Sequence, residues 1–114
     1  MYILLMEIPM KVVKPYGILD DNTSNQFCLE ISSLLEENTE FILIDFKDVT
    51  FMDSLGLRRL IICLNKVRSA GANLFICSIN DQLRILFELT GMNDVFEIFA
   101  CREEIEHKIL TKIS

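Results

Sequence analysis

A carboxylate, a hydroxyl and a glycine stand together near the middle of the chain, at Asp53, Ser54 and Gly56. Apolar residues at helical spacing follow them, so we expect them at the start of a helix. The unpaired amides and the dipole of a helix N-terminus favour a phosphate or a carboxylate. This corner is therefore expected to receive a phosphate or a partner protein, although Asp53 and Ser54 are also ordinary capping residues. Phe51 and Met52, just before it, are candidate interface anchors, but apolar residues before a cap are more often hydrophobic-staple or core residues, and we expect that role for them.

Composition argues against several other chemistries. The formal net charge of −6 argues against general nucleic-acid binding, which needs a basic face. The sequence has no glycine-rich phosphate-binding loop and no histidine near Ser54 to activate it, so we expect no catalytic residues and no enzymatic activity. His107 lies in a charged stretch, where we expect a surface position. We also expect no cofactor.

The cysteines show neither a CxxC pair nor the spacing of a zinc site. They stand among apolar residues, so we expect buried free thiols in a reducing cytoplasm and no bound metal. They are Cys28, Cys63, Cys77 and Cys101. No apolar run approaches the roughly 20 residues that span a bilayer, and the opening residues lack the basic start of a signal peptide. We therefore expect a cytoplasmic protein with no membrane contact.

The N-terminal part predicts two antiparallel strands. Tyr2–Ile8 is a continuous apolar run, and Met10–Tyr16 alternates more loosely. Pro9 between them favours a turn or a sheet edge, because proline cannot donate to a strand ladder. Gly17–Asp20 is expected to close the second strand.

The next segments predict a helix and then a buried strand. Thr23 and Gln26 have the spacing of a capping box, and the apolar residues that follow predict a helix to about Glu37. Phe41–Ile44 is a short apolar run bounded by polar residues on both sides. Such a run is typical of a central parallel strand that is covered on both faces.

The second half of the chain alternates helices and strands. After Gly56, apolar residues at helical spacing predict a helix that stops at Gly71. The remaining predicted elements are a strand at Asn73–Cys77, a helix capped by Ser78 or Asn80 and followed by Gly91, a strand at Val95–Phe99 and a helix at Glu103–Leu110. This order predicts an α/β fold in a single domain of residues 1–114, with a mixed sheet of about five strands, a parallel centre and about four covering helices.

Five segments, in order along the chain, resemble the motifs of STAS domains and, within them, of bacterial anti-sigma-factor antagonists. They cover the approach to the first helix, the central strand with its loop and corner, the start of the next strand and the end of a later helix. The segments are Gly17–Asp20, Ile42–Ser54, Gly56–Leu57, Gly71–Leu74 and Leu86–Met92. The resemblance spans about residues 10 to 110 and implies a STAS-like fold.

The resemblance implies a cytoplasmic partner-switching protein. In the unphosphorylated state such a protein binds an anti-sigma factor, usually a serine kinase with a histidine-kinase-like ATPase fold, and so frees the sigma factor. Phosphorylation by that kinase blocks binding, and a PP2C-type phosphatase restores it. We expect a monomer or a weak dimer. The alternative is a STAS scaffold subunit of a signalling complex, without phospho-control.

The sequence departs from the family pattern in two ways. The usual phosphoacceptor stands immediately before the glycine, and in this chain that position is Leu55, which has no hydroxyl. Ser54 is the hydroxyl that remains within the motif. Arg58 and Arg59 stand where the family commonly has small residues, so this helix is a basic island on an acidic chain.

Three hypotheses follow for the corner. In the first, Ser54 is the phosphoacceptor, with Asp53 and Asp20 as acidic neighbours. In the second, the partner binds without phospho-control and Leu55 is an apolar contact. In the third, Leu55 faces the core and the site is vestigial. The predicted partner-binding residues are Asp20, Asp21, Thr23, Asp53, Ser54, Leu55, Gly56, Arg58 and Arg59.

Overall fold

A parallel sheet forms the centre of the computed structural model, which describes residues 9–113. Within these residues the sheet has four strands in the order β1-β3-β5-β6. The strands are β1 (Met10–Val13), β3 (Phe41–Asp45), β5 (Asn73–Cys77) and β6 (Glu97–Phe99), and every pair is parallel. The apolar run of β3 is buried on both faces, which confirms the predicted central parallel strand.

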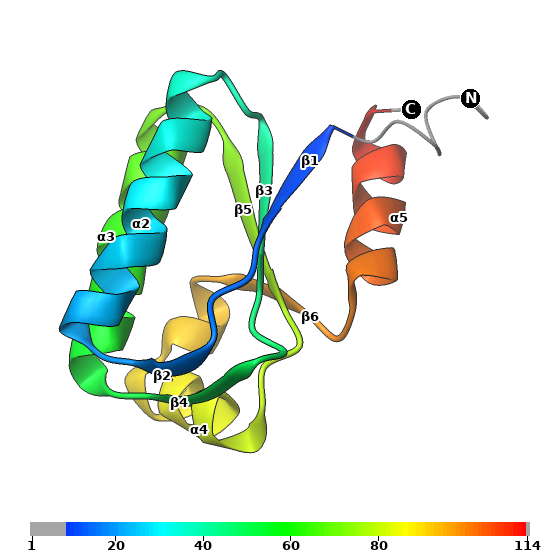
Figure 1. The fold of residues 1–114 in the computed structure, drawn as a ribbon. Helices are drawn as coiled ribbons and strands as arrows, with labels where there is room; N and C mark the ends of the chain where they lie inside the picture. Colours follow the sequence, from blue (N-terminus) through cyan, green and yellow to red (C-terminus); the bar gives the residue numbers. More distant parts are fainter. Residues whose placement is uncertain (1–8, 114) are drawn as a thin grey trace.

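Two further strands, β2 (Gly17–Leu19) and β4 (Val49–Met52), form a small parallel sheet at one end of the molecule (Figure 1). The sequence predicted that the first of these segments closes the preceding strand, and that prediction is wrong. Gly17 has a positive φ of 74° and its amide donates to the carbonyl of Asp48 at 2.9 Å, so the chain leaves β1 and begins a new pairing.

Helices cover both faces of the main sheet (Figure 1). Two long helices, α2 (Asp21–Glu36) and α3 (Ser54–Ser69), lie side by side on one face, and α5 (Arg102–Ile113) covers the other. The shorter α4 (Asp81–Thr90) lies near the small sheet and is followed by a 3₁₀ turn, η1 (Met92–Asp94). The α/β class with four helices over a mainly parallel sheet is as predicted.

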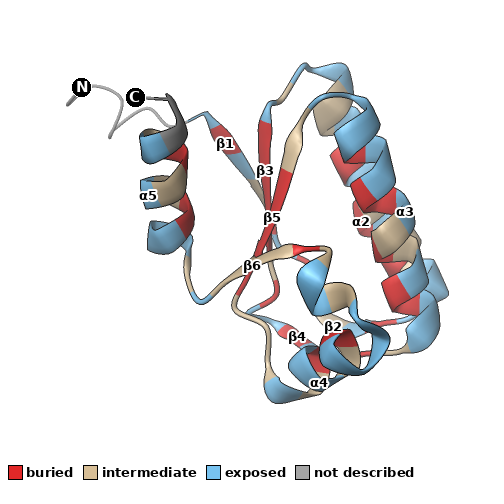
Figure 2. Ribbon diagram, turned by 180° about the vertical axis from the view of Figure 1, so that it is seen from behind, coloured by how far each residue is buried: buried red, intermediate tan, exposed pale blue. Residues whose placement is uncertain are grey.

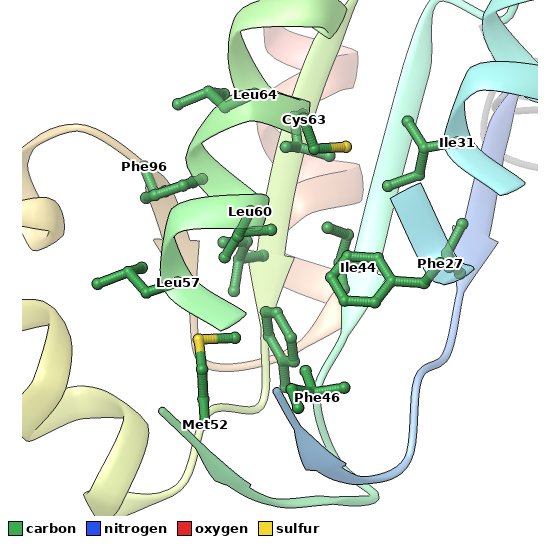
Figure 3. Packing of buried hydrophobic residues seen from close by; sticks show 14 of the residues in the cluster. Phe27, Ile31, Ile44, Phe46, Met52, Leu57, Leu60, Cys63, Leu64 and Phe96 are labelled. Carbon is green, nitrogen blue, oxygen red and sulfur yellow. The ribbon is translucent and has the colours of Figure 1, made fainter. Parts of the chain in front are cut away.

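The buried residues form two apolar clusters, one on each face of the sheet (Figure 2). In the larger cluster, Phe27 and Ile31 of α2 and Leu60 of α3 pack with Ile44 and Phe46 (Figure 3). The smaller cluster joins α5 to the opposite face of the strands and consists of Met10, Phe41, Leu43, Phe75, Cys77, Ile105 and Ile109. Because β3 and β5 contribute to both clusters, the sheet is buried from both sides.

The first capping box differs from the predicted one. Asp20, and not Thr23, is the N-cap of α2: its carboxylate accepts from the amide of Thr23, and the hydroxyl of Thr23 accepts from the amide of Asp20, each at 2.9 Å. Helix α2 therefore begins earlier than the predicted box of Thr23 and Gln26 allows. The predicted strand at Tyr2–Ile8 lies outside the described residues.

The later helix ends agree with the sequence. Helix α3 begins after its N-cap Asp53, and Gly71 follows its end with a φ of 78°. Asn80 caps α4, and Gly91 ends that helix in the left-handed conformation. Each of these residues has a side chain or a backbone freedom that favours a helix end. The residue type alone was therefore enough to predict where these helices begin or end.

Candidate functional site

The N-termini of α2 and α3 lie next to each other, at the carboxyl ends of the small parallel sheet (Figure 1). Leu19 and Met52 are paired in register, so the capping residues that follow them, Asp20 and Asp53, leave the two strands side by side. The amide of Asp53 also donates to the carbonyl of Leu19 at 3.2 Å. The structure thus brings together the two loops that the sequence predicted to form one face.

The carboxylates of Asp20 and Asp53 are helix caps. Asp53 accepts from the amide of Gly56 at 2.8 Å. The hydrogen bonds that Thr23 donates from its amide and its hydroxyl lower the pKa of Asp20 below its usual value. Each acid is therefore held in place by its own helix, and a binding partner would meet it in a fixed orientation.

Gly56 is buried and allows α3 to approach β2 closely. A Cβ atom at this position would lie 2.2 Å from the carbonyl oxygen of Leu19 and 3.1 Å from the hydroxyl of Ser24. No L side chain fits that space without a shift of the backbone. The absence of a side chain at Gly56 therefore lets the first turn of α3 pack directly against the backbone of β2.

Ser54 and Leu55, in the first turn of α3, are exposed. Half of the surface of Leu55 is open to solvent, so the hypothesis that Leu55 faces the core is wrong. Two further apolar side chains, Ile18 and Phe51, are exposed as register partners on β2 and β4. Exposed apolar residues thus occur both in the first turn of α3, beside the Ser54 hydroxyl, and on the two strands that lead into the corner.

The sequence placed Phe51 and Met52 in the core, and this was correct only for Met52. Met52 is fully buried, whereas Phe51 is 44% exposed. The strand has only two residues between its buried ends, Thr50 and Phe51, and both are exposed. Simple alternation would have buried one of them, so the local pattern gave no signal for an exposed phenylalanine.

The two neighbouring arginines of α3 have different roles. The Arg59 guanidinium donates to the Asp21 carboxylate at 2.7 Å and so ties α3 to α2. This hydrogen bond lowers the pKa of Asp21 and raises that of Arg59. Arg58 is exposed, and no carboxylate in residues 9–113 lies within ion-pair distance of it. Arg58 is therefore open to a partner, while Arg59 holds the helices together.

A shallow depression continues from this corner along the outer side of α3. It is lined by Leu55, Arg58 and Ile62 together with the Asp21–Arg59 ion pair. Ile62 is 48% exposed, and on the neighbouring helix Leu29 is also exposed. The exposed surface of α2 and α3 beyond the corner is therefore also apolar and is bordered by basic side chains.

Gln82 of α4 and the N-cap of that helix, Asn80, support the corner and were missed as site residues in the sequence. The side-chain amide of Gln82 accepts from the amide of Met52 and donates to its carbonyl, each at 2.9 Å. The side-chain amide of Asn80 donates to the backbone carbonyls of Val49 and Thr50 at 3.1 and 3.2 Å. Helix α4 thus binds the free edge of β4 directly before Asp53. The sequence indicated Asn80 as a cap but carried no signal for these long-range bonds.

A separate pocket lies away from this corner, between α4 and β6. It has a volume of about 480 Å³, and Phe87, Ile98 and Phe99 are among the residues that line it. Arg84 at its margin is already paired with Asp81 and Glu88. With its cation engaged in this way, the pocket offers a ligand mainly apolar contacts.

No group of three or more potential metal ligands occurs in the described part of the chain. Likewise, none of the helices formed by residues 9–113 has the length and apolar character needed to cross a bilayer.

Comparison with known proteins adds a family match. The model of the STAS domain family matches residues 7–105. An anti-sigma-B factor antagonist of Staphylococcus aureus (strain NCTC 8325 / PS 47) is 28% identical over 86 residues, which are 75% of this chain and 80% of that protein.

Solved structures share the fold. A Thermotoga maritima protein, assigned provisionally as an anti-sigma factor antagonist, has a TM-score of 0.80 at 19% identity, covering 88% of this chain and 86% of its own. The anti-sigma factor antagonist SpoIIAA in its unphosphorylated form has a TM-score of 0.65 at 17% identity over 90% of each chain. The phosphorylated form of SpoIIAA, from Bacillus, has a TM-score of 0.66 at 20% identity, covering 89% of this chain and 91% of its own. At these identities the structures establish the fold alone.

Proposed function

This chain belongs to the STAS domain family, and from that premise we propose that it is an anti-sigma-factor antagonist. In this role it binds an anti-sigma factor in the cytoplasm and so frees a sigma factor. The observation that carries the proposal is the exposed corner at Ser54 and Leu55, where a hydroxyl lies at a helix start beside solvent-exposed apolar side chains. The antagonist from Staphylococcus aureus, similar over three quarters of this chain, supports the same role.

The proposed binding face joins the capping loop of α2 to the first two turns of α3. Leu55 supplies an apolar contact at its centre, and Arg58 supplies a cation that no residue of the described chain neutralises by an ion pair. Such a combination suits a partner with an apolar patch beside acidic groups, because apolar anchors give affinity and charges give orientation. The proposed partner is an anti-sigma factor of the serine-kinase type, with a histidine-kinase-like ATPase fold.

We further propose that phosphorylation of Ser54 controls this contact. Ser54 is the first residue of α3 and is exposed, so a kinase can reach its hydroxyl. A phosphate would add about −1.5 to −2 charges at the face. The helix dipole would stabilise it, and Arg58 lies one turn further along α3. The added charge would oppose burial of the apolar corner against the partner, and a PP2C-type phosphatase would reverse the change.

The second candidate is a STAS scaffold subunit that binds without phospho-control. The exposure of Leu55 favours it, because an apolar side chain at the usual acceptor position can serve as a permanent contact. Substitution with charge at Ser54 distinguishes the two candidates. A switch requires that the charge weaken binding, whereas a permanent apolar contact depends mainly on Leu55.

The test is calorimetric titration against purified serine-kinase anti-sigma factors from the source organism. We expect wild type to bind and Ser54→Asp to bind at least about tenfold more weakly, equivalent to about 1.4 kcal/mol. Ser69→Asp is the matched control, since Ser69 is an exposed serine at the opposite end of the same helix. Incubation with the kinase and ATP, followed by peptide mass spectrometry, should place phosphate on Ser54.

The outcomes separate the two parts of the proposal. Equal binding of wild type and Ser54→Asp, or the absence of phosphate at Ser54, removes the switch and leaves the antagonist role. Failure of wild type to bind any of these anti-sigma factors removes the antagonist role itself.

A further inference from the structure

Two cysteines face each other across the contact between α2 and α3. The thiol of Cys28 on α2 donates to the carbonyl oxygen of Arg59 on α3 at 3.5 Å. In an α-helix that same carbonyl accepts from the amide four residues later, which belongs to Cys63. Side chains of a helix lean towards its N-terminus, so the side chain of Cys63 lies over the turn that contains Arg59. Both thiols therefore lie beside the turn of α3 that contains Arg59.

Two further observations agree with this placement. The sulfur of Cys63 points away from its own helix, towards α2 (Figure 3). Cys28 and Cys63 also line the same small cavity, together with Leu29, Arg59 and Lys66. The thiols are thus neighbours in a site that two basic side chains border.

The environments of the two thiols differ. Cys28 is partly exposed, and its pKa is lowered by the thiol of Cys63 and by the charges of Arg59 and Lys66. Cys63 is buried, and its pKa is raised by its contact with Cys28 and by burial. The thiolate is the reactive form of cysteine. Cys28 is therefore the attacking thiol, and Cys63 is placed to resolve its oxidation product.

We propose that Cys28 and Cys63 form a peroxide-oxidisable dithiol that closes to a disulfide between α2 and α3. The Cys28 thiolate attacks one oxygen of hydrogen peroxide, the O–O bond breaks, and a sulfenic acid and hydroxide form. The sulfur of Cys63 then displaces the sulfenic hydroxyl, which leaves as water with the Cys63 proton. Overall, the two thiols are oxidised to a disulfide and one peroxide is reduced to two waters. A small-molecule thiol reverses the reaction by exchange.

The other two cysteines provide an internal comparison. Cys77 is buried on the opposite face of the sheet, where burial raises its pKa, and Cys101 stands just before α5. Peroxide should therefore oxidise Cys28 about tenfold faster than Cys77. The same preparation of the whole protein serves for both measurements.

The experiment treats the reduced protein with an equimolar amount of hydrogen peroxide and digests it without reductant. Peptide mass spectrometry should find the Cys28 and Cys63 peptides joined, with the loss of two hydrogen atoms, and dithiothreitol should separate them. In Cys63→Ser, dimedone should trap a sulfenic acid on Cys28. Cys101→Ser is the control and should still form the linkage.

Three results would overturn the proposal. They are sulfinic acid at Cys28 without a linkage in wild type, a linkage that joins Cys77 to Cys101 in preference, and a Cys28 thiol that reacts no faster than Cys77. All three are read on the wild-type chain, so they remain decisive even where a serine variant fails to fold. None of them depends on the proposed sigma-factor role.

Discussion

At the scale of single residues, Ser24 and Gly56 determine how closely α3 approaches its neighbours. Ser24 is fully buried in α2, and its hydroxyl has no hydrogen-bond partner in the described part of the chain. It lies beside Gly56, where even a methyl group would meet the backbone of β2. Small residues on both helices, Ser24 and Gly56, therefore permit the close approach of α3 to α2 and β2. The hydroxyl of Ser24 is left without a hydrogen-bond partner in the described residues.

Replacement of Ser24 by alanine should stabilise the protein. A buried hydroxyl without a partner is unfavourable, so we expect the free energy of unfolding to rise by about 1 kcal/mol. Urea denaturation followed by circular dichroism measures the change. Ser33→Ala on the exposed face of α2 is the control for helix propensity, and Ser24→Ala should gain more than this control. A loss of stability would mean that the hydroxyl has a favourable contact.

Replacement of Gly56 by alanine should destabilise the protein, although alanine normally favours a helix. The added Cβ would lie 2.2 Å from the carbonyl oxygen of Leu19, a backbone atom. We expect a loss of about 3 kcal/mol in the free energy of unfolding. Gly91→Ala is the comparison, because nothing lies within 4 Å of its Cβ and only its positive φ is unfavourable. A milder effect at Gly56 than at Gly91 would contradict the packing described.

At the scale of elements, α4 completes the edge of β4. Gln82 bonds to both backbone groups of Met52, and Asn80 bonds to the carbonyls that precede it. These bonds fix the last strand residues before the corner at Asp53. The sequence identified the helix ends at Gly71 and Gly91, because glycine itself favours the backbone conformation that ends a helix. A hydrogen bond between segments that are far apart in the sequence leaves no such local pattern.

Loss of the Gln82 side chain should destabilise β4 at the corner. Gln82→Ala leaves the amide and the carbonyl of Met52 unpaired in a partly buried position, so we expect a loss of about 2 kcal/mol. Hydrogen exchange should also show faster exchange at the Met52 amide. The control, Gln26→Ala, removes an exposed glutamine of α2 and should change stability by less than about 0.5 kcal/mol. Unchanged exchange at Met52 would contradict the role of Gln82.

The ion pair between α2 and α3 should make stability depend on acid pH. The guanidinium of Arg59 holds the pKa of Asp21 below its usual 3.8, so the unfolded chain takes up the proton first as the pH falls. The contribution of Asp21 is complete above about pH 3.8 and is lost as the pH falls through the lower pKa of the folded state. The stability difference between wild type and Asp21→Asn should shrink below that pH. In an Arg59→Gln background the difference should not vary in this way.

At the scale of the whole molecule, the sheet is buried from both sides by separate apolar clusters. Alternating strands and helices predicted this α/β arrangement, and β3 was correctly identified from its apolar run. The division into a main sheet and the small β2–β4 sheet was not predicted. It depends on the turn at Gly17 and on pairing with β4, which a local pattern does not encode.

Helix α5 should contribute to global stability as much as the helices of the larger cluster. Ile105 is fully buried against the sheet, so we expect Ile105→Ala to reduce the free energy of unfolding by about 3 kcal/mol. Leu60→Ala in α3 should have a comparable effect. Leu89→Ala is the control at an 82% exposed position, where the change should stay within about 0.5 kcal/mol. A small effect at Ile105 would show that α5 is dispensable for folding.

The parallel pairing of the strands has a consequence for how the chain is made. Met10 pairs with Phe41, and Phe41 pairs with Asn73, so a whole helix separates the partners in each case. During synthesis β1 must remain unpaired until β3 has emerged from the ribosome, and β3 must then wait for β5. We therefore expect α2 to form early and the sheet to condense late. In that interval the apolar Phe41–Ile44 segment of the nascent chain needs protection from aggregation.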